Sequence, residues 1–166
     1  LTDGYGLAEA GVSYAIEKRV DLVLTCDCGV QSFSEVDQLN EAGIAVIVTD
    51  HHHCSADLPA AVAVVNPNRF DDHSHSKGLA GAGVALKLVQ ALGQRMGQAE
   101  LWRSVVDLAA VGTVGDAMNL TYENRTLVRF GIEKLRTNAN PGLAALMKAV
   151  KIDAQRCTAI DIGYKI

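Results

Sequence analysis

The sequence predicts an α/β fold in which a mainly parallel sheet is flanked by helices. Three short apolar runs, at residues 21–26, 44–48 and 61–65, have the length of buried strands. Segments with apolar residues at helical spacing separate the first two runs and follow the third. Such alternation favours parallel pairing, because a crossover helix returns the chain to the same end of the sheet. Hydrophobic residues make up 49% of the 166 residues, which is sufficient for a packed core.

Local signals support each element of the first half. Residues 7–18 have apolar positions at helical spacing, and Ser32 with Glu35 predicts a capping box for a helix that runs through Glu41. Gly43 is expected to terminate that helix before the strand at 44–48. Asn66-Pro67-Asn68 predicts a turn after the third strand, and residues 69–77 are expected to form a polar loop.

The second half is predicted to be largely helical. The glycine-rich segment 78–83 opens a helix that runs to about Leu92, and an apolar helix is expected from Leu101 to Val111. A further helix should span about 123–135, and Pro141 favours the start of a last helix. The final residues, 160–166, resemble a strand that is cut short.

The run Asp50-His51-His52-His53 carries the strongest chemical signal, because it directly follows the apolar strand at 44–48. An acid and adjacent imidazoles are costly at the edge of a core unless something binds them, and a divalent metal suits both ligand types. Asp27 follows the strand at 21–26, and Asp116 follows the apolar segment that ends near Val114. The carboxyl ends of parallel strands form one rim, so Asp27 and Asp50 to His52 are expected there.

Each of these acids also has a plainer interpretation. Asp27 precedes a Cys-Gly pair and is equally consistent with a turn residue, while Asp50 and Asp116 are consistent with local caps. A second metal site at Asp71, Asp72, His73 and His75 is less favoured than a solvated loop. A zinc site built from Cys26, Cys28, Cys54 and His53 is less favoured than reduced, packed cysteines, since no Cys-x-x-Cys spacing is present.

Composition limits the classes of protein. No apolar run is long enough to span a bilayer, the start has no signal-peptide pattern, and cysteine usage suggests a cytosolic protein. The net charge of −4 does not by itself indicate nucleic-acid binding, so a polyanion would need local cations or metal ions. The first residue is not Met, which leads us to expect a fragment of a longer protein.

An ordered series of motifs resembles the DHH phosphoesterases, and within them the RecJ-type single-strand-specific exonucleases. Thr49-Asp50-His51-His52 resembles the signature motif, and residues 25–30 resemble the motif before it, with Cys28 where Asn is more usual. Residues 110–116 resemble the fourth motif. The remaining matches are Gly4-Tyr5-Gly6-Leu7, Leu58-Pro59-Ala60-Ala61, Asn66-Pro67-Asn68, Gly81-Ala82-Gly83-Val84-Ala85, Lys87-Leu88, Asn124-Arg125, Leu127-Val128 and Gly131.

The family's first motif, two aspartates spaced by one residue, is absent from the sequence. We therefore expect residues 1–166 to be a partial DHH phosphoesterase domain, Rossmann-like and truncated at both ends, which lacks the C-terminal domains and is inactive alone. The resemblance implies two Mn²⁺ or Mg²⁺ ions in the complete domain. It further implies that Asp27 bridges them, that His51 and Asp116 ligate one, and that Asp50 and His52 serve catalysis by orienting an imidazole and contacting the phosphate.

The implied activity is metal-dependent 5′-to-3′ digestion of single-stranded DNA in repair and recombination, by a cytoplasmic protein with no membrane association. Repair or single-strand-binding proteins are the implied protein partners. Gly81 and Gly83 are equally consistent with phosphate binding at a helix start and with tight packing, and Arg125 is more often solvated than bound to phosphate. Two alternatives stay open: a DHH enzyme for short oligoribonucleotides or cyclic dinucleotides, and a catalytically silent DHH binding module.

Overall fold

The computed structural model describes residues 5–166, which divide into two compact units between Lys77 and Gly78. Residues 1–4 lie outside the described part, and with them Asp3 and the first residue of the Gly4-Tyr5-Gly6-Leu7 segment. Within residues 5–166, no helix combines the length and apolar character needed to cross a bilayer. Each unit is described by itself below.

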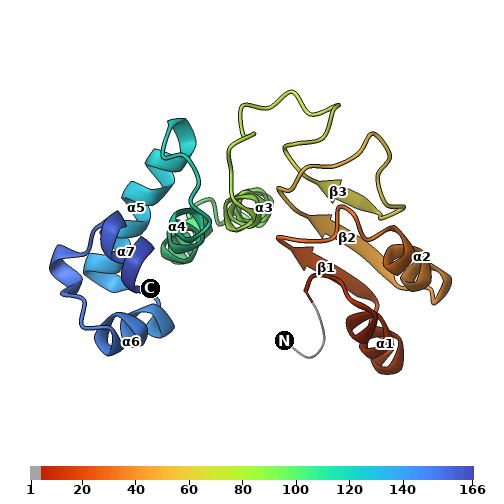
Figure 1. Cartoon of the computed structure of the whole chain (residues 1–166), viewed down its shortest axis with the longest axis horizontal. Helices are drawn as coiled ribbons and strands as arrows, with labels where there is room; N and C mark the ends of the chain where they lie inside the picture. Colours follow the sequence, from red (N-terminus) through yellow and green to blue (C-terminus); the bar gives the residue numbers. More distant parts are fainter. Residues whose placement is uncertain (1–4) are drawn as a thin grey trace. The chain divides into compact units, whose positions relative to one another are not determined.

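The first unit confirms the predicted parallel α/β sheet (Figure 1). The strand order is β1-β2-β3, and both pairings are parallel, with Cys26 opposite Thr49 and Thr49 opposite Val65. The elements in chain order are α1 (Glu9–Lys18), β1 (Leu22–Cys26), α2 (Phe33–Glu41), β2 (Ala45–Thr49) and β3 (Ala63–Val65).

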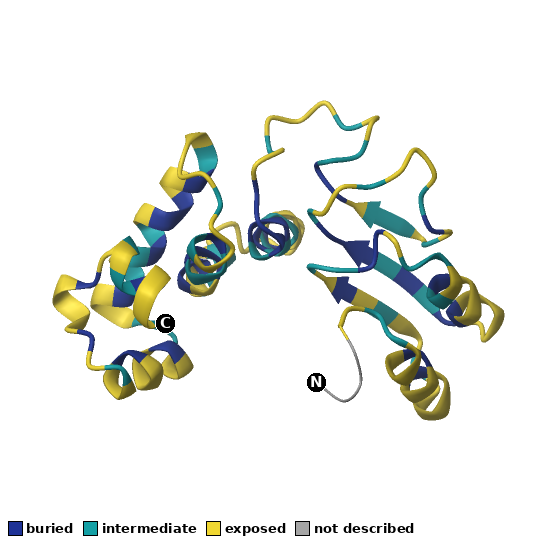
Figure 2. Cartoon of the chain, viewed as in Figure 1, coloured by how far each residue is buried: buried dark blue, intermediate teal, exposed yellow. Residues whose placement is uncertain are grey.

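One hydrophobic core holds this unit together. Val46 and Val48 of the central strand are completely buried, and they belong to one cluster with Val36 and Leu39 of α2 and Val12 of α1 (Figure 2). The spacing of Val36 and Leu39 places both on one stripe of α2, which is why this helix packs on the sheet. Gly43 follows α2 with φ of +77°, a left-handed conformation that suits glycine, and it ends the helix as predicted.

The second unit is helical throughout, and all of its residues are described. Two hydrophobic clusters form its core, one centred on the contact between the fourth and fifth helices and the other beneath the last two helices. Its elements are α3 (Gly81–Arg95), the 3₁₀ helix η1 (Leu101–Ser104), α4 (Val106–Gly115), α5 (Tyr122–Asn138), α6 (Pro141–Ala149), the 3₁₀ helix η2 (Ala154–Arg156) and α7 (Ala159–Lys165).

Three local predictions were wrong. The last residues form the helix α7 rather than a strand, because Thr158 and Asp161 make a capping box in which each side chain accepts the other's backbone N–H. Ser32 makes no capping hydrogen bond, since its own N–H donates to Gly29 in a turn that replaces the extended entry a cap needs. The predicted helix from Leu101 is instead a short 3₁₀ turn, and the regular helix begins at Val106.

Gly131 is expected to be the least replaceable glycine of the second unit. A Cβ atom at this position would lie 2.1 Å from Ala110 Cβ and 2.8 Å from the Val106 carbonyl oxygen. Gly131→Ala should therefore lower the free energy of unfolding by about 2–3 kcal/mol, because two rigid helices must separate. Urea denaturation tests this, with Gly115→Ala as the control because nothing lies within 4 Å of a Cβ there. Equal midpoints for both variants would contradict the close approach of α4 and α5.

Candidate metal centre

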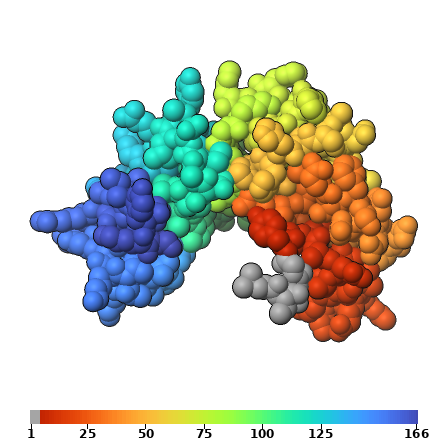
Figure 3. All heavy atoms as spheres, viewed as in Figure 1, coloured from red at the N-terminus to blue at the C-terminus, as the bar shows by residue number. Residues whose placement is uncertain are grey.

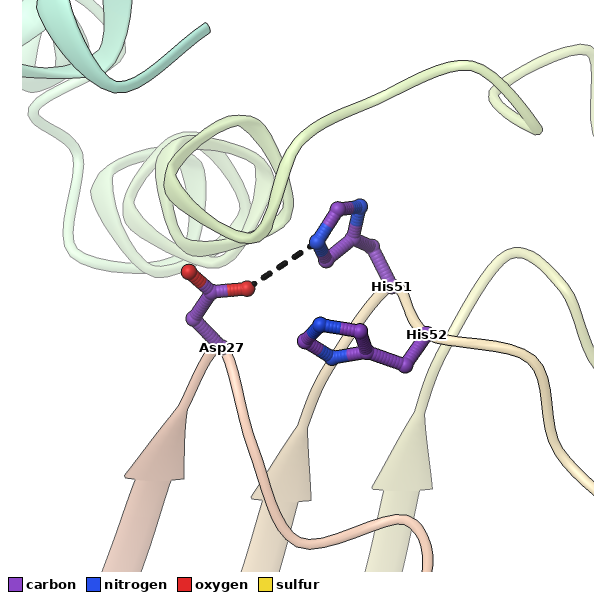
Figure 4. A group of neighbouring side chains, drawn as sticks. All are labelled: Asp27, His51 and His52. Atoms are coloured by element: carbon purple, nitrogen blue, oxygen red, sulfur yellow. Dashed lines mark ion pairs between the residues drawn. The ribbon is translucent and has the colours of Figure 1, made fainter. Parts of the chain in front are cut away.

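The ends of β1 and β2 place three polar side chains at one edge of the sheet. The strands run parallel, and the register continues past β1 because the Asp27 N–H donates to the Thr49 carbonyl oxygen at 2.9 Å. Residues that follow the two strands consequently emerge side by side. Asp27 leaves from β1, while His51 and His52 leave from β2 (Figure 4).

The backbone turns sharply at Asp27. This residue has φ of 65°, in the left-handed region that few side chains other than Asn and Asp tolerate. Thr25 Oγ1 donates to the Cys28 carbonyl oxygen at 2.7 Å and closes the turn, and Gly29 continues it with φ of +107°. A Cβ at Gly29 would lie 3.0 Å from Thr25 Oγ1, so the turn is also tightly packed. Strain of this kind concentrates at functional sites, because the surroundings must maintain it.

The three side chains converge on one point. His51 Nε2 lies 3.1 Å from Asp27 Oδ1, and ligand atoms of Asp27, His51 and His52 all lie within 4.8 Å of one another. Among residues 5–166, Asp27 Oδ1 is one of two buried side-chain oxygen or nitrogen atoms with no hydrogen-bond partner. This carboxylate oxygen is buried and makes no hydrogen bond, although the ring nitrogen of His51 lies beside it, so it can accept a cation. A carboxylate together with imidazole suits Mn²⁺. These three residues therefore fit a divalent metal ion.

Asp50 lies behind this group and has a different environment. It is 1% exposed, and its carboxylate accepts four hydrogen bonds, one from the Val30 N–H at 3.0 Å and three from His51 and His52. Burial acts to raise the pKa of this carboxyl, but the hydrogen bonds from Val30, His52 and His51 together outweigh it and hold the pKa below its ordinary value. Asp50 is thus an ionised acceptor that fixes the backbone and one imidazole.

His52 is oriented by that acceptor. Its Nδ1 lies 2.7 Å from Asp50 Oδ1, and because an ionised carboxylate only accepts hydrogen bonds, this contact places a ring proton on Nδ1. The side chain is 50% exposed, so solvent and ligands can reach the ring while Asp50 fixes its Nδ1. A carboxylate behind an imidazole is the arrangement that orients metal-bound and proton-transferring histidines.

Two asparagines that the sequence indicated only as a turn also hold this segment. Asn66 is 3% exposed, and its Nδ2 donates to the His52 carbonyl oxygen at 2.9 Å. Asn68 Nδ2 donates to the His51 carbonyl oxygen. The turn itself also forms, because the Asn68 N–H donates to Asn66 Oδ1 at 2.8 Å. Their position directly after β3, the neighbour of β2, is the sequence signal that could have identified them.

Four sequence-predicted site residues lie in the second unit. Asp116 is exposed and follows the last turn of α4, and Arg125 is exposed on α5. Gly83 lies at the start of α3, where a Cβ would be 3.1 Å from Leu79 Cδ2, and a Cβ at Gly112 would be 2.5 Å from Ala82 Cβ. These contacts favour the packing interpretation of the segment that contains Gly81 and Gly83. The roles of all four residues in a common site stay predictions.

The two less favoured metal sites gain no support. In the loop after β3, Asp71 pairs with Arg69 Nη2 at 2.6 Å, and Asp72 accepts hydrogen bonds from Ser74. All four cysteines are free thiols. Burial raises the pKa of the Cys28 thiol, and the charges of Asp50 and Asp27 raise it further. Within residues 5–166, the only group of three or more His, Cys, Asp or Glu side chains that could hold a metal is Asp27, His51 and His52.

Comparison with known proteins agrees with this fold. The model of the DHH family, N-terminal domain, matches residues 4–113. The chain is 38% identical to the single-stranded-DNA-specific exonucleases RecJ of Dickeya dadantii and of Escherichia coli, over 99% of its length and 30% of each relative. It thus spans less than a third of these curated relatives. It also resembles a crystal structure of exonuclease RecJ bound to manganese, with a TM-score of 0.84 and 36% identity over 98% of this chain and 40% of that one.

The family model covers well over half of the chain, and it includes both strand ends that carry Asp27, His51 and His52. The parallel sheet, the acid after β1 and the acid–imidazole run after β2 are features that the sequence and the structure share. The chain therefore belongs to the DHH family.

Proposed function

We propose that the protein is a metal-dependent phosphodiesterase, and specifically a 5′-to-3′ exonuclease on single-stranded DNA that acts in repair and recombination in the cytoplasm. The observation that carries the proposal is the convergence of Asp27, His51 and His52 on one point, where a buried oxygen of the Asp27 carboxylate makes no hydrogen bond. Similarity to RecJ exonucleases over nearly the whole chain supports the choice of substrate.

We also propose that residues 1–166 are part of a DHH phosphoesterase domain and that the remaining parts of the protein complete it. The relatives are more than three times as long as the matched region, so residues beyond this chain have room to supply further ligands and substrate contacts. On this proposal the chain by itself is inactive. Activity measurements therefore belong with the intact protein that carries this chain.

The metal chemistry follows from the donor set. Asp27, His51 and Asp116 are the proposed ligands of this chain, with Mn²⁺ or Mg²⁺ as the ion, and the imidazole donors favour Mn²⁺. A pair of such ions lowers the pKa of a bound water and neutralises charge on the phosphate. Asp27 brings the negative charge that attracts the cation, and its strained backbone holds that charge at the sheet edge before any ligand arrives.

His52 and Asp50 are proposed to act on the substrate side. The Nδ1 proton of His52 is held by Asp50, so Nε2 can hold or release a proton beside the scissile phosphate. Asp50 acts through the imidazole and the backbone rather than by touching the phosphate, because it is buried. Arg125 and the N–H groups at Gly81 and Gly83 are the proposed phosphate contacts of the second unit, and repair or single-strand-binding proteins the proposed partners.

A substrate panel tests the proposal. The intact protein is expected to release mononucleotides from the 5′ end of single-stranded DNA with Mn²⁺ or Mg²⁺, and to lose this activity in EDTA. A 5′-labelled strand should yield labelled mononucleotide at once, whereas a 3′-labelled strand should shorten progressively. Preferred cleavage of a diribonucleotide or a cyclic dinucleotide would assign the other DHH substrate class. No hydrolysis of any substrate with either metal would identify a silent binding module.

A further inference from the structure

Charge is distributed unevenly between the two units. Residues 1–77 contain four Lys and Arg against twelve Asp and Glu, whereas residues 78–166 contain eleven against seven. The chain's overall charge of −4 thus conceals a basic second unit. Polyanion binding depends on local cations rather than on total charge, so this unit is where such a surface should be sought.

The basic side chains gather along α5 and α6. Two open hollows of about 570 and 600 Å³ share Arg136 and Thr137 in their linings, so they adjoin. Arg125 and Arg129 line the first hollow, and Lys148 and Lys151 line the second. We call the two hollows together the α5–α6 groove; the chain segments that carry its residues are coloured cyan to blue in Figure 3.

The cations of this groove are mostly free to bind a ligand. All five are exposed, and among the described residues Arg125, Arg129, Lys148 and Lys151 take part in no ion pair. The fifth, Arg136, donates through Nε and Nη2 to the Cys157 carbonyl oxygen, which positions the guanidinium but does not neutralise it. The linings include only two acids, Glu133 and Asp153.

The spacing of these cations suits an extended polyanion. Arg125, Arg129 and Arg136 are separated by four and seven residues on one helix, so they share a face over about 16 Å at 1.5 Å per residue. Lys148 and Lys151 extend the row beyond that helix. Leu120, Val128 and Ile132 line the first hollow beside the arginines and offer apolar contact but no base-reading groups. Contacts of this kind position a phosphate backbone without selecting a sequence.

We propose that the α5–α6 groove binds the phosphodiester backbone of single-stranded DNA, at nucleotides other than those at the scissile bond. This inference rests on the proposed function for the identity of the polyanion. The groove gives the substrate a contact that depends on its length, since a dinucleotide offers too few phosphates to reach every cation. Affinity should consequently fall with salt, by a slope of about 0.7 per phosphate contact.

Binding without turnover is the direct test. The intact protein is titrated with fluorescein-labelled oligo(dT) in EDTA, and anisotropy is followed from low to moderate salt. The double variant Arg129→Glu/Lys148→Glu is expected to bind about tenfold more weakly at moderate salt and to show a shallower salt slope. Arg95→Glu is the matched control, because Arg95 is an exposed cation of α3 outside the groove, and its affinity should stay at the wild-type value.

A second variant separates binding from folding. Lys151 has φ of 57°, a conformation that favours glycine, so Lys151→Gly removes a charge without adding backbone strain. It should weaken oligo(dT) binding two- to fourfold while the unfolding midpoint does not fall. Wild-type affinity in both groove variants, or an equal loss in Arg95→Glu, would overturn the groove assignment.

Kinetic measurements distinguish failure of the groove assignment from failure of the proposed nuclease function. In Arg129→Glu/Lys148→Glu, the ratio of kcat/KM for a 40-nucleotide strand to that for a dinucleotide should fall about tenfold. An unchanged ratio in an active enzyme would reject the groove and leave the nuclease assignment intact. A wild-type protein that binds oligo(dT) through the groove but hydrolyses nothing would reject the nuclease and retain the groove.

Discussion

Asp27→Asn in the intact protein is expected to reduce Mn²⁺-dependent hydrolysis of single-stranded DNA by at least about a thousandfold. The substitution keeps the shape of the side chain and the turn at φ of 65°, but it removes the charge that faces His51 Nε2 at 3.1 Å. His51→Ala removes the nitrogen partner and is expected to cause a loss of the same order. The rate of mononucleotide release at saturating Mn²⁺ measures both effects.

Two variants serve as matched controls for these losses. Asp37→Asn changes an exposed acid on α2, and His53→Ala removes the neighbouring imidazole, which is exposed and not part of the converging group. Both should keep near wild-type rates. Manganese binding, followed by electron paramagnetic resonance, should weaken in Asp27→Asn and in His51→Ala, but not in the two control variants. Full activity in either of those two variants would refute the proposed metal centre.

Asp50→Ala is expected to lower both stability and activity, because it removes the acceptor of four hydrogen bonds in a buried place. Three backbone N–H groups and the His52 ring would lose their partner, at a cost of about 3–4 kcal/mol in the free energy of unfolding. Asp50→Asn retains one carbonyl oxygen and should lose less. Urea denaturation measures the difference, with Asp37→Ala as the exposed control.

The same carboxylate should make stability depend on pH in the acid range. The pKa of Asp50 is lower in the folded chain than its ordinary value of about 4, so the folded state binds this proton less readily than the unfolded state. The resulting stabilisation is complete above pH 4 and is lost as pH falls through the lowered pKa. Wild-type protein should therefore lose stability below pH 4 more steeply than Asp50→Asn. Parallel pH profiles for the two proteins would contradict this assignment.

Short-range patterns predicted most of the secondary structure. The buried strand β2 was predicted because it is a short apolar run. Gly43 was predicted to end α2, and its left-handed backbone in the structure is the conformation that glycine adopts most easily. The prediction failed at residues 159–165, where Ile160 and Ile162 alternate with polar residues as in a strand. There the Thr158–Asp161 capping box and the burial of Ile162 favour a helix. The alternation of apolar and polar residues along the chain indicates neither the capping box nor the burial.

The candidate site divides in the same way. The order of motifs and the position of Asp27 and His51 after apolar strands were visible in the sequence, because a strand that enters a core must end before a charged residue. The sequence did not show that Asp50 is a buried hydrogen-bond acceptor, whereas its neighbours His51 and His52 face the proposed metal site. Asp50 reaches back to the Val30 N–H, and Asn66 reaches His52, across contacts that exist only after the strands have paired.

The sequence by itself determined the parallel α/β character of residues 1–77, the helices of the second unit and membership of the DHH family, since these depend on composition, periodicity and motif order along the chain. Only the tertiary structure decided which side chains meet. Pairing of β1 with β2 brings Asp27 to 3.1 Å from His51, although 24 positions separate them in the sequence. Likewise, tertiary packing brings Lys148 and Lys151 beside the arginines of α5, in one groove within a chain of negative net charge. The reason is physical: side-chain distances depend on strand register and helix packing, which arise from long-range contacts.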